Sequence, residues 1–127
     1  MTDHALSVRA RGIRGATTAD RNTREAILDA TQEMLEHLIQ ANDLTPEDVA
    51  TAWFSTTADL NADFPAIAAR RLGWTHVALM CGPEMNVPGA LPMCVRVMVL
   101  ANTTRRQDEV THVYLRGARV LRPDLLT

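Results

Sequence analysis

A single arginine interrupts the most apolar stretch of the chain. Arg96 lies within residues 94–101 (CVRVMVLA), a run that is too short and too rich in β-branched residues for a helix. The run predicts a strand buried on both faces. A guanidinium stays charged at every working pH, and burying it without a partner is costly. Arg96 is therefore expected to meet a bound anion, a cluster of carbonyl groups or a carboxylate of its own chain, and the run itself leaves these alternatives open.

The size and charge of the chain limit its class. Its 127 residues are 46% hydrophobic, which fits one domain with a sizeable core. We expect this single domain at residues 8–127, preceded by a flexible N-terminal extension at residues 1–7. A formal net charge of -2 provides no positive field, and an aromatic content of 4% leaves few rings for base stacking. We therefore expect no nucleic-acid partner.

Membrane, metal and cofactor partners are not expected either. No apolar stretch approaches the roughly 20 residues of a membrane span, and Asp3 and His4 lie where a signal peptide needs an apolar segment. Cys81 and Cys94 form no disulfide framework and have no paired Cys/His spacing for zinc. The sequence therefore predicts a cytoplasmic protein with two free thiols, no metal and no cofactor.

The polar residues also restrict the chemistry. All 13 basic residues are arginine, which excludes a lysine Schiff base and a lysine general base. Neither Ser7 nor Ser55 lies in a Gly-x-Ser-x-Gly motif, and the histidines are scattered at positions 4, 37, 76 and 112. Hydrolysis by a catalytic triad therefore finds little support.

Hydrophobic periodicity predicts helices between strands. A long helix is expected at residues 22–42, where Asn22 and Glu25 form a start signal, and a short helix at residues 65–72. Strands are expected at residues 8–18, 52–57, 74–80, 94–101 and 110–115, the last in a late hairpin, with an extended segment near residues 120–123. A loop at residues 81–89 is expected to present Cys81 and Glu84 side by side. The pattern predicts an α/β (α+β) fold, a mixed five-stranded sheet with a long helix and a short helix packed on it.

Several stretches together resemble a known family. They are residues 11–18 (RGIRGATT), 64–66 (FPA) followed by Arg70, Cys81 with residues 84–85 (EM), 94–98 (CVRVM), and 112–115 (HVYL) with 122–125 (RPDL). In these stretches the chain resembles the small monofunctional chorismate mutases of the trimeric pseudo-α/β-barrel class, over nearly all of residues 11–125. The resemblance implies an isomerase of phenylalanine and tyrosine biosynthesis that converts chorismate to prephenate. It also implies a homotrimer with active sites at the subunit interfaces.

The reaction implied by the resemblance is an intramolecular [3,3]-sigmatropic (Claisen) rearrangement. The ether C–O bond breaks ahead of C–C bond formation, so the ether oxygen gains negative charge. Such a step needs a folded dianionic substrate and a fixed cation at the developing charge, without covalent or general acid-base catalysis. A chain without lysine, triad or metal motif suits this chemistry.

The resemblance assigns the centre of the site to five residues. Arg96 donates to the ether oxygen and to a carboxylate. Arg14 and Tyr114 hold the enolpyruvyl carboxylate, and Cys81 with Glu84 binds the ring hydroxyl. Arg96, Glu84 and Arg14 are the implied catalytic residues.

Five more residues complete the implied substrate-binding site. Phe64, Ala66 and Arg70 come from the neighbouring subunit, and Leu121 and Arg122 close the site through the C-terminal segment. Arg70 ends the predicted short helix, so its alternative role is a favourable interaction with the helix dipole.

Two other functions remain open at this point. An enamine/imine deaminase of similar trimeric architecture also uses an interface arginine to hold a carboxylate, but it activates water. A non-catalytic sensor of an aromatic-pathway acid could use the same arginines without turnover.

Overall fold

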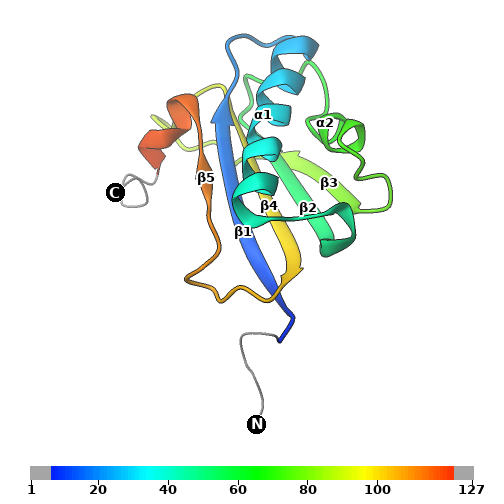
Figure 1. Ribbon diagram of the computed structural model, residues 1–127. Helices are drawn as coiled ribbons and strands as arrows, with labels where there is room; N and C mark the ends of the chain where they lie inside the picture. Colours follow the sequence, from blue (N-terminus) through cyan, green and yellow to red (C-terminus); the bar gives the residue numbers. More distant parts are fainter. Residues whose placement is uncertain (1–6, 122–127) are drawn as a thin grey trace.

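A five-stranded mixed sheet forms the centre of the computed structural model, which describes residues 7–121 (Figure 1). The strands are β1 (Arg9–Thr18), β2 (Val49–Thr56), β3 (Ala78–Pro83), β4 (Cys94–Thr103) and β5 (Val113–Tyr114). They lie in the order β3-β2-β4-β1-β5. β4 is antiparallel to both β1 and β2, whereas β2 pairs with β3 and β1 pairs with β5 in parallel. The predicted mixed sheet is confirmed.

The long helix α1 (Arg24–Asn42) has caps at both ends. Thr23 Oγ1 accepts a hydrogen bond from the Ala26 N–H at 3.1 Å, and Asp43 ends the helix in the left-handed region. The predicted start at Asn22 is therefore one residue early. Asn22 Oδ1 instead accepts from the backbone N–H groups of Asn61 and Ala62, so this side chain fixes the loop before α2.

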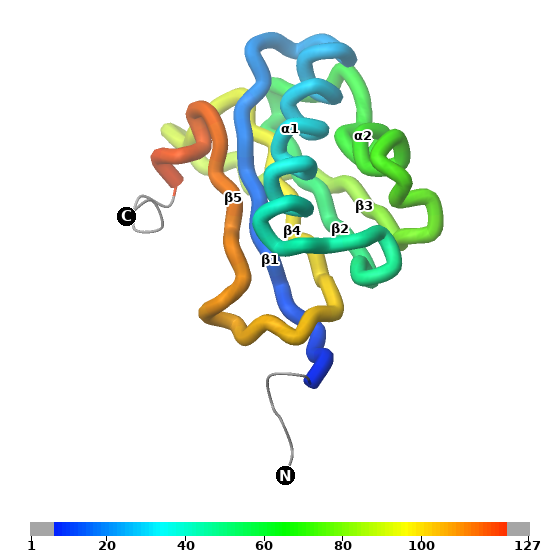
Figure 2. Tube along the Cα trace, in the orientation of Figure 1, coloured from blue at the N-terminus to red at the C-terminus, as the bar shows by residue number. Residues whose placement is uncertain are grey.

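The short helix α2 (Ala66–Arg71) lies on the same side of the sheet as α1 (Figures 1 and 2). Pro65 precedes its first turn, and Gly73 follows it at a φ of +99°, a conformation that glycine adopts without strain. Two 3₁₀ helices complete the described elements, η2 (Pro46–Asp48) and η3 (Arg116–Leu121).

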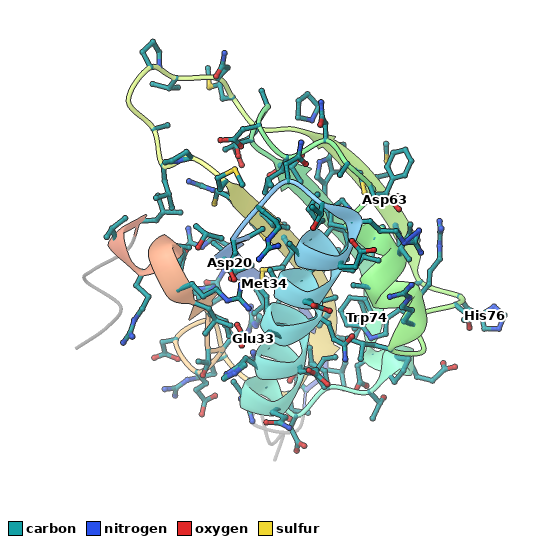
Figure 3. The ribbon with its side chains drawn as sticks, turned by 90° about the horizontal axis from the view of Figure 1, so that it is seen from above. Asp20, Glu33, Met34, Asp63, Trp74 and His76 are labelled. Carbon is teal, nitrogen blue, oxygen red and sulfur yellow. The ribbon has the colours of Figure 1, made fainter. Side chains whose placement is uncertain are left out.

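The hydrophobic core lies between the two helices and the sheet. Ile13 of β1, Phe54 of β2 and Val97 of β4 are buried in it together with Met34 and Trp74, which Figure 3 labels. Neither α1 nor α2 covers the opposite face of the sheet, where η3 contacts the end of β1 at Thr18. Trp53, Met80 and Met98 are all exposed on that face.

The prediction that the Arg96 strand is buried on both faces is wrong for the single chain. In β4, Val95, Val97 and Val99 are buried, whereas Arg96 and Met98 between them are exposed. Side chains alternate across a strand, and the helices cover only one face. The run predicted a fully buried strand because apolar residues also lie on the face that the helices leave open.

Three other predicted elements differ from the structure. β3 occupies residues 78–83 and not 74–80, because Trp74 belongs to the core beside α2. β5 contains only residues 113–114 and pairs with β1, so β4 and β5 form no hairpin. Residues 116–121 form a 3₁₀ helix where an extended segment was expected, since Pro123 restricts only the residue directly before it.

Candidate active site

The face of the sheet that the helices leave open carries Arg14 and Arg96. β1 and β4 are antiparallel, and their register places Ala16 opposite Arg96 and Arg14 opposite Met98. Arg14 and Arg96 are thus diagonal neighbours on one face, a relation that separates residues by about 7 to 8 Å. Two arginines at neighbouring positions on one face suit a ligand with two negative groups.

A hollow of about 310 Å³ surrounds these arginines and is called here the Arg96 hollow. Its volume is at the lower end of the range for small-molecule sites, which begins near 300 Å³. Strands β1, β2, β4 and β5 and the end of β3 supply its walls. The lining residues are Arg14, Gly15, Ala16, Trp53, Ser55, Pro83, Glu84, Arg96, Val97, Met98 and Tyr114.

Glu84 connects Arg96 with β2. Arg96 Nε lies 3.4 Å from Glu84 Oε2, and Ser55 Oγ donates a 2.7 Å hydrogen bond to the same oxygen. The ion pair that the sequence left open for Arg96 is therefore present. The Arg96 side chain is 45% exposed, so such a pair contributes only about 0 to 1 kcal/mol. Its charge stays available to a ligand in the hollow.

Arg14 and Tyr114 form the other end of the hollow. Within the described part of the chain, Arg14 Nε is buried and has no hydrogen-bond partner. A buried donor without an acceptor is costly, and a bound anion would satisfy it. Tyr114 lies beside Ala16 in the parallel pairing of β5 with β1, which brings it to the same hollow.

Cys81 and Phe64 lie in a second hollow of about 410 Å³, called here the Phe64 hollow. The expectation that Cys81 and Glu84 lie side by side in a loop is wrong. Cys81 belongs to edge strand β3, and its side chain packs against the core, whereas Glu84 follows the strand and lines the Arg96 hollow. The two hollows meet at Pro83, which lines both.

The remaining predicted residues lie outside the Arg96 hollow. Ala66 is buried in α2 and only 5% exposed, so its side chain offers almost no surface to another subunit. Arg70 is exposed on the last turn of α2, and Leu121 is half-buried at the end of η3. Arg122 lies outside the described residues.

Sequence reasoning missed three residues of this region. Trp53 and Ser55 line the Arg96 hollow from β2, and His112 Nδ1 accepts a 3.0 Å hydrogen bond from the Arg14 N–H. The alternation of residues 52–56 could have indicated that Trp53 and Ser55 share a face. No sequence signal indicates the contact between His112 and Arg14, because the two residues are far apart in the chain.

Cys94 lies under the site without supplying a nucleophile. Burial raises the pKa of its thiol, and the hydrogen bond and charge of Arg96 oppose this increase only in part. The thiol therefore remains protonated at neutral pH.

The described residues also contain no group of three or more His, Cys, Asp or Glu side chains that could hold a metal ion.

Among residues 7–121, no helix has the length and apolar character needed to cross a membrane.

Comparison with known proteins shows the family. The model of the family described as chorismate mutase type I matches residues 10–125, nearly the whole chain. The chain therefore belongs to the chorismate mutase type I family. Its activity is that of a chorismate mutase, an isomerase that converts chorismate to prephenate. Neither the deaminase nor the sensor is favoured by this match.

Individual relatives agree with the family model. The chain is 51% identical to the chorismate mutase AroH of Bacillus subtilis over 116 residues, which cover 91% of each protein. It is 49% identical to the chorismate mutase AroH of Thermus thermophilus over 116 residues, 91% of this chain and 95% of the relative. A solved chorismate mutase structure from Clostridium thermocellum is 48% identical and superposes with a TM-score of 0.85, covering 86% of this chain and 97% of the other.

Proposed function

We propose that chorismate rearranges in the Arg96 hollow of one subunit, completed by the Phe64 hollow of a neighbouring subunit in a homotrimer. The observation that carries this proposal is the placement of Arg14 and Arg96 together on the sheet face that α1 and α2 leave open. The substrate is a dianion, so two cations at fixed positions can hold both its carboxylates while its ring and side chain fold together.

Arg96 stabilises the charge that develops on the ether oxygen. Its Nε faces Glu84, and this contact orients the planar guanidinium before substrate arrives. A donor that is already oriented needs no reorganisation during the reaction, which is the main advantage of a protein site over water. The same guanidinium also contacts one carboxylate of the substrate.

Arg14 and Tyr114 bind the enolpyruvyl carboxylate. The buried Arg14 Nε has no acceptor among the described residues, and a carboxylate oxygen would supply one. Tyr114 can donate its phenolic hydrogen to the same group. These contacts are equally available to the ground state and the transition state, so they act mainly on substrate affinity.

Glu84 accepts a hydrogen bond from the ring hydroxyl of chorismate. Ser55 already donates to Glu84 Oε2, and this hydrogen bond fixes the carboxylate directly after the end of β3. The other contacts, from Cys81, Phe64 and Arg70, come from the neighbouring subunit. The resemblance placed Cys81 in the same subunit as Glu84. We assign Cys81 instead to the subunit that supplies Phe64, because Cys81 and Phe64 line the same hollow.

The apolar surface around the Arg96 hollow supports the homotrimer. Trp53, Met80 and Met98 are between 46% and 56% exposed on the open face of the sheet, and Phe64 is 67% exposed. Large exposed apolar side chains grouped on one face are typical of protein interfaces. A ring of three subunits can cover this face and bring each Phe64 hollow to a neighbour's Arg96 hollow.

The proposal includes action in the cytoplasm. Cys81 and Cys94 are both free thiols, which is typical of proteins in a reducing compartment.

One assay tests the proposed function. Purified protein is mixed with chorismate, the loss of chorismate absorbance is followed, and prephenate is identified as the product. We expect turnover far above the uncatalysed rate without release of ammonia from enamine substrates. Binding of chorismate without turnover would indicate the sensor, and turnover of an enamine with ammonia release would indicate the deaminase.

A further inference from the structure

His112 contacts the site through the backbone of Arg14. The Arg14 N–H donates a 3.0 Å hydrogen bond to His112 Nδ1. The strand β5 begins only at Val113, which pairs with Gly15, so at Arg14 the imidazole stands where a further residue of β5 would continue the sheet. On its other side, Arg14 is paired with β4 opposite Met98. His112 therefore fixes the outer edge of β1 at the residue that carries the guanidinium.

The backbone before His112 is held from the helix side of the sheet. The buried Asn42, at the end of α1, forms two hydrogen bonds with the backbone of Thr111. Its Nδ2 donates to the Thr111 carbonyl at 2.8 Å, and its Oδ1 accepts from the Thr111 N–H at 2.7 Å. The backbone directly before His112 is thus anchored to α1.

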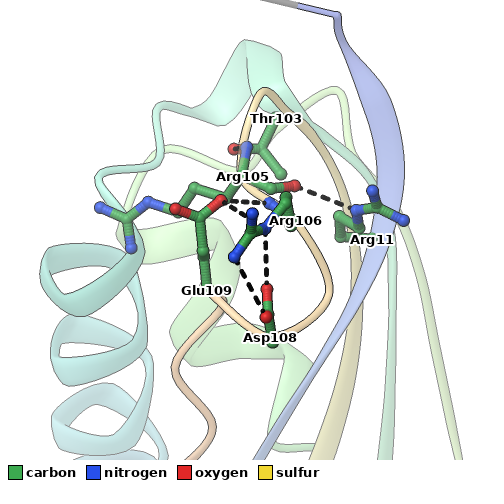
Figure 4. Close-up of polar contacts among 6 residues, drawn as sticks. All are labelled: Arg11, Thr103, Arg105, Arg106, Asp108 and Glu109. Carbon is green, nitrogen blue, oxygen red and sulfur yellow. Dashed lines mark hydrogen bonds and ion pairs between the residues drawn. The ribbon is translucent and has the colours of Figure 1, made fainter. Parts of the chain in front are cut away.

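The chain leading to this anchor is also fixed (Figure 4). Arg11 Nε donates to the Arg105 carbonyl at 3.0 Å, and the Arg106 side chain bonds to Asp108. Arg105 Nη1 donates to the Ala41 carbonyl at the end of α1 at 2.7 Å. The connection that leads to His112 is therefore anchored to both α1 and β1.

The position of Arg14 depends on this backbone contact. Its Nε has no hydrogen-bond partner in the described part of the chain, so side-chain contacts through Nε do not orient the guanidinium before substrate binds. The backbone register of β1 sets the direction of the side chain instead. A shift of Arg14 N–H away from its place would move the guanidinium within the hollow.

We propose that His112 is a positioning residue that holds Arg14 for the substrate carboxylate, and that it does so only as a neutral imidazole. This inference rests on the role of Arg14 in the proposed function. An acceptor at Nδ1 requires a lone pair there, so the ring proton lies on Nε2. Protonation would replace the acceptor by a donor that faces the Arg14 N–H.

The contact depends on pH because its acceptor is an imidazole nitrogen that can take up a proton. On the open face, the titratable or charged side chains nearest in register to His112 are Arg14 of β1 and Tyr114 of β5. In its own connection, Arg105 donates to the Ala41 carbonyl, and Asp108 and Glu109 pair with Arg106. The 3₁₀ helix η3 carries Arg116, paired with Glu33, and α1 contributes the uncharged Asn42. Histidine side chains titrate between pH 5 and 8. Acid therefore adds a second positive group beside Arg14 and removes the hydrogen bond.

The test compares three variants of His112 that differ in where the side chain places a hydrogen-bond acceptor. His112→Asn places an amide oxygen close to the position of Nδ1, His112→Gln places its amide near Nε2, and His112→Ala has no acceptor. We expect His112→Ala and His112→Gln to raise the KM for chorismate about 3- to 10-fold with kcat changed less than about 2-fold, as loss of one hydrogen bond predicts. His112→Asn should keep a KM near that of the wild type. His76→Asn, at an exposed histidine away from this face, is the matched control (Figure 3).

The pH profile provides a second readout. In the wild type, kcat/KM should fall as pH decreases through the titration of histidine while kcat stays flat, and His112→Asn should remove this fall. Equal KM values in His112→Ala and the wild type would overturn the proposal. A KM in His112→Asn as high as that in His112→Gln would also overturn it, because a residue that only fills space does not distinguish the two amides.

A measurement without turnover separates this inference from the proposed function. The backbone amide resonance of Arg14 is followed by ¹⁵N NMR as pH is lowered, in the protein without substrate. It should shift with the titration of histidine in the wild type and His76→Asn, but not in His112→Asn. An Arg14 resonance that ignores pH in the wild type would overturn the contact even in an active enzyme, and a shift in an inactive protein would leave the contact standing while the proposed function fails.

Discussion

Replacement of Arg96 tests the electrostatic part of the mechanism. Arg96→Ala removes a preorganised donor to the developing oxyanion, and loss of such a donor costs about 3 to 4 kcal/mol. We expect kcat to fall at least about 100-fold while the fold is retained, since the side chain is half exposed and its ion pair with Glu84 is weak. Arg96→Lys keeps the charge but loses the planar fork and should recover only part of kcat. An Arg96→Ala protein with the kcat of the wild type would show that this arginine is structural.

The pH dependence of kcat tests whether a proton moves in the chemical step. No proton is transferred in the rearrangement, so kcat should be nearly flat across the neutral range with little solvent isotope effect. A bell-shaped kcat profile would instead indicate general acid-base catalysis of the kind that a deaminase needs.

At the scale of elements, the close contact of β1 with α1 makes a measurable prediction. A Cβ added at Gly15 would lie 2.9 Å from Val97 Cγ1 and 3.3 Å from Met34 and Leu38, so it cannot fit without movement. Gly15→Ala should lower the free energy of unfolding by about 1 to 3 kcal/mol, as overpacking of a core does. It should also raise KM, because β1 carries Arg14.

Gly12→Ala provides the matched control on the same strand. The added Cβ would meet Met98 Sδ at 3.5 Å, an ordinary contact with the end of a flexible side chain. Thermal unfolding followed by circular dichroism should show a decrease in Tm for Gly15→Ala and little change for Gly12→Ala. Equal Tm values for the two variants would contradict the packing of β1 against α1 described above.

The elements differ in how far the sequence could predict them. The long helix followed from a local period, since Ile27, Met34 and Leu38 repeat at helical spacing and are buried as expected. The exposure of Arg96 did not follow, because a strand run cannot show whether a helix, another subunit or solvent covers each face. The prediction that Cys81 lies in a loop was also wrong, because β3 includes the glycine and the proline that suggested a loop there.

The residues of the site could also be predicted only in part. Arg14, Glu84, Arg96 and Tyr114 were named from family motifs, and the structure brings these four residues into one hollow. Ser55 and His112 were missed because their contacts depend on strand register. Ser55 reaches Glu84 only because β2 pairs with β3, and His112 reaches Arg14 only because β5 starts beside β1.

At the scale of the whole molecule, each site of the proposed homotrimer takes residues from two subunits. In that proposal Arg96 comes from one subunit and Arg70 from its neighbour in a closed ring of three. The variants Arg96→Ala and Arg70→Ala should therefore each impair every site of their own homotrimer. Their mixture should behave differently, because a mixed trimer can contain intact sites.

The most direct test is the activity of such mixed trimers. Equal amounts of the Arg96→Ala and Arg70→Ala proteins are unfolded together, refolded, and assayed with chorismate after the trimer is confirmed by its mass in solution. A site is intact when an Arg70→Ala subunit supplies Arg96 and its Arg96→Ala neighbour supplies Arg70, which random assembly produces in about one site in four. We expect recovery of about a quarter of the wild-type activity from two nearly inactive proteins. Refolded trimers without any gain in activity would contradict a site shared between subunits.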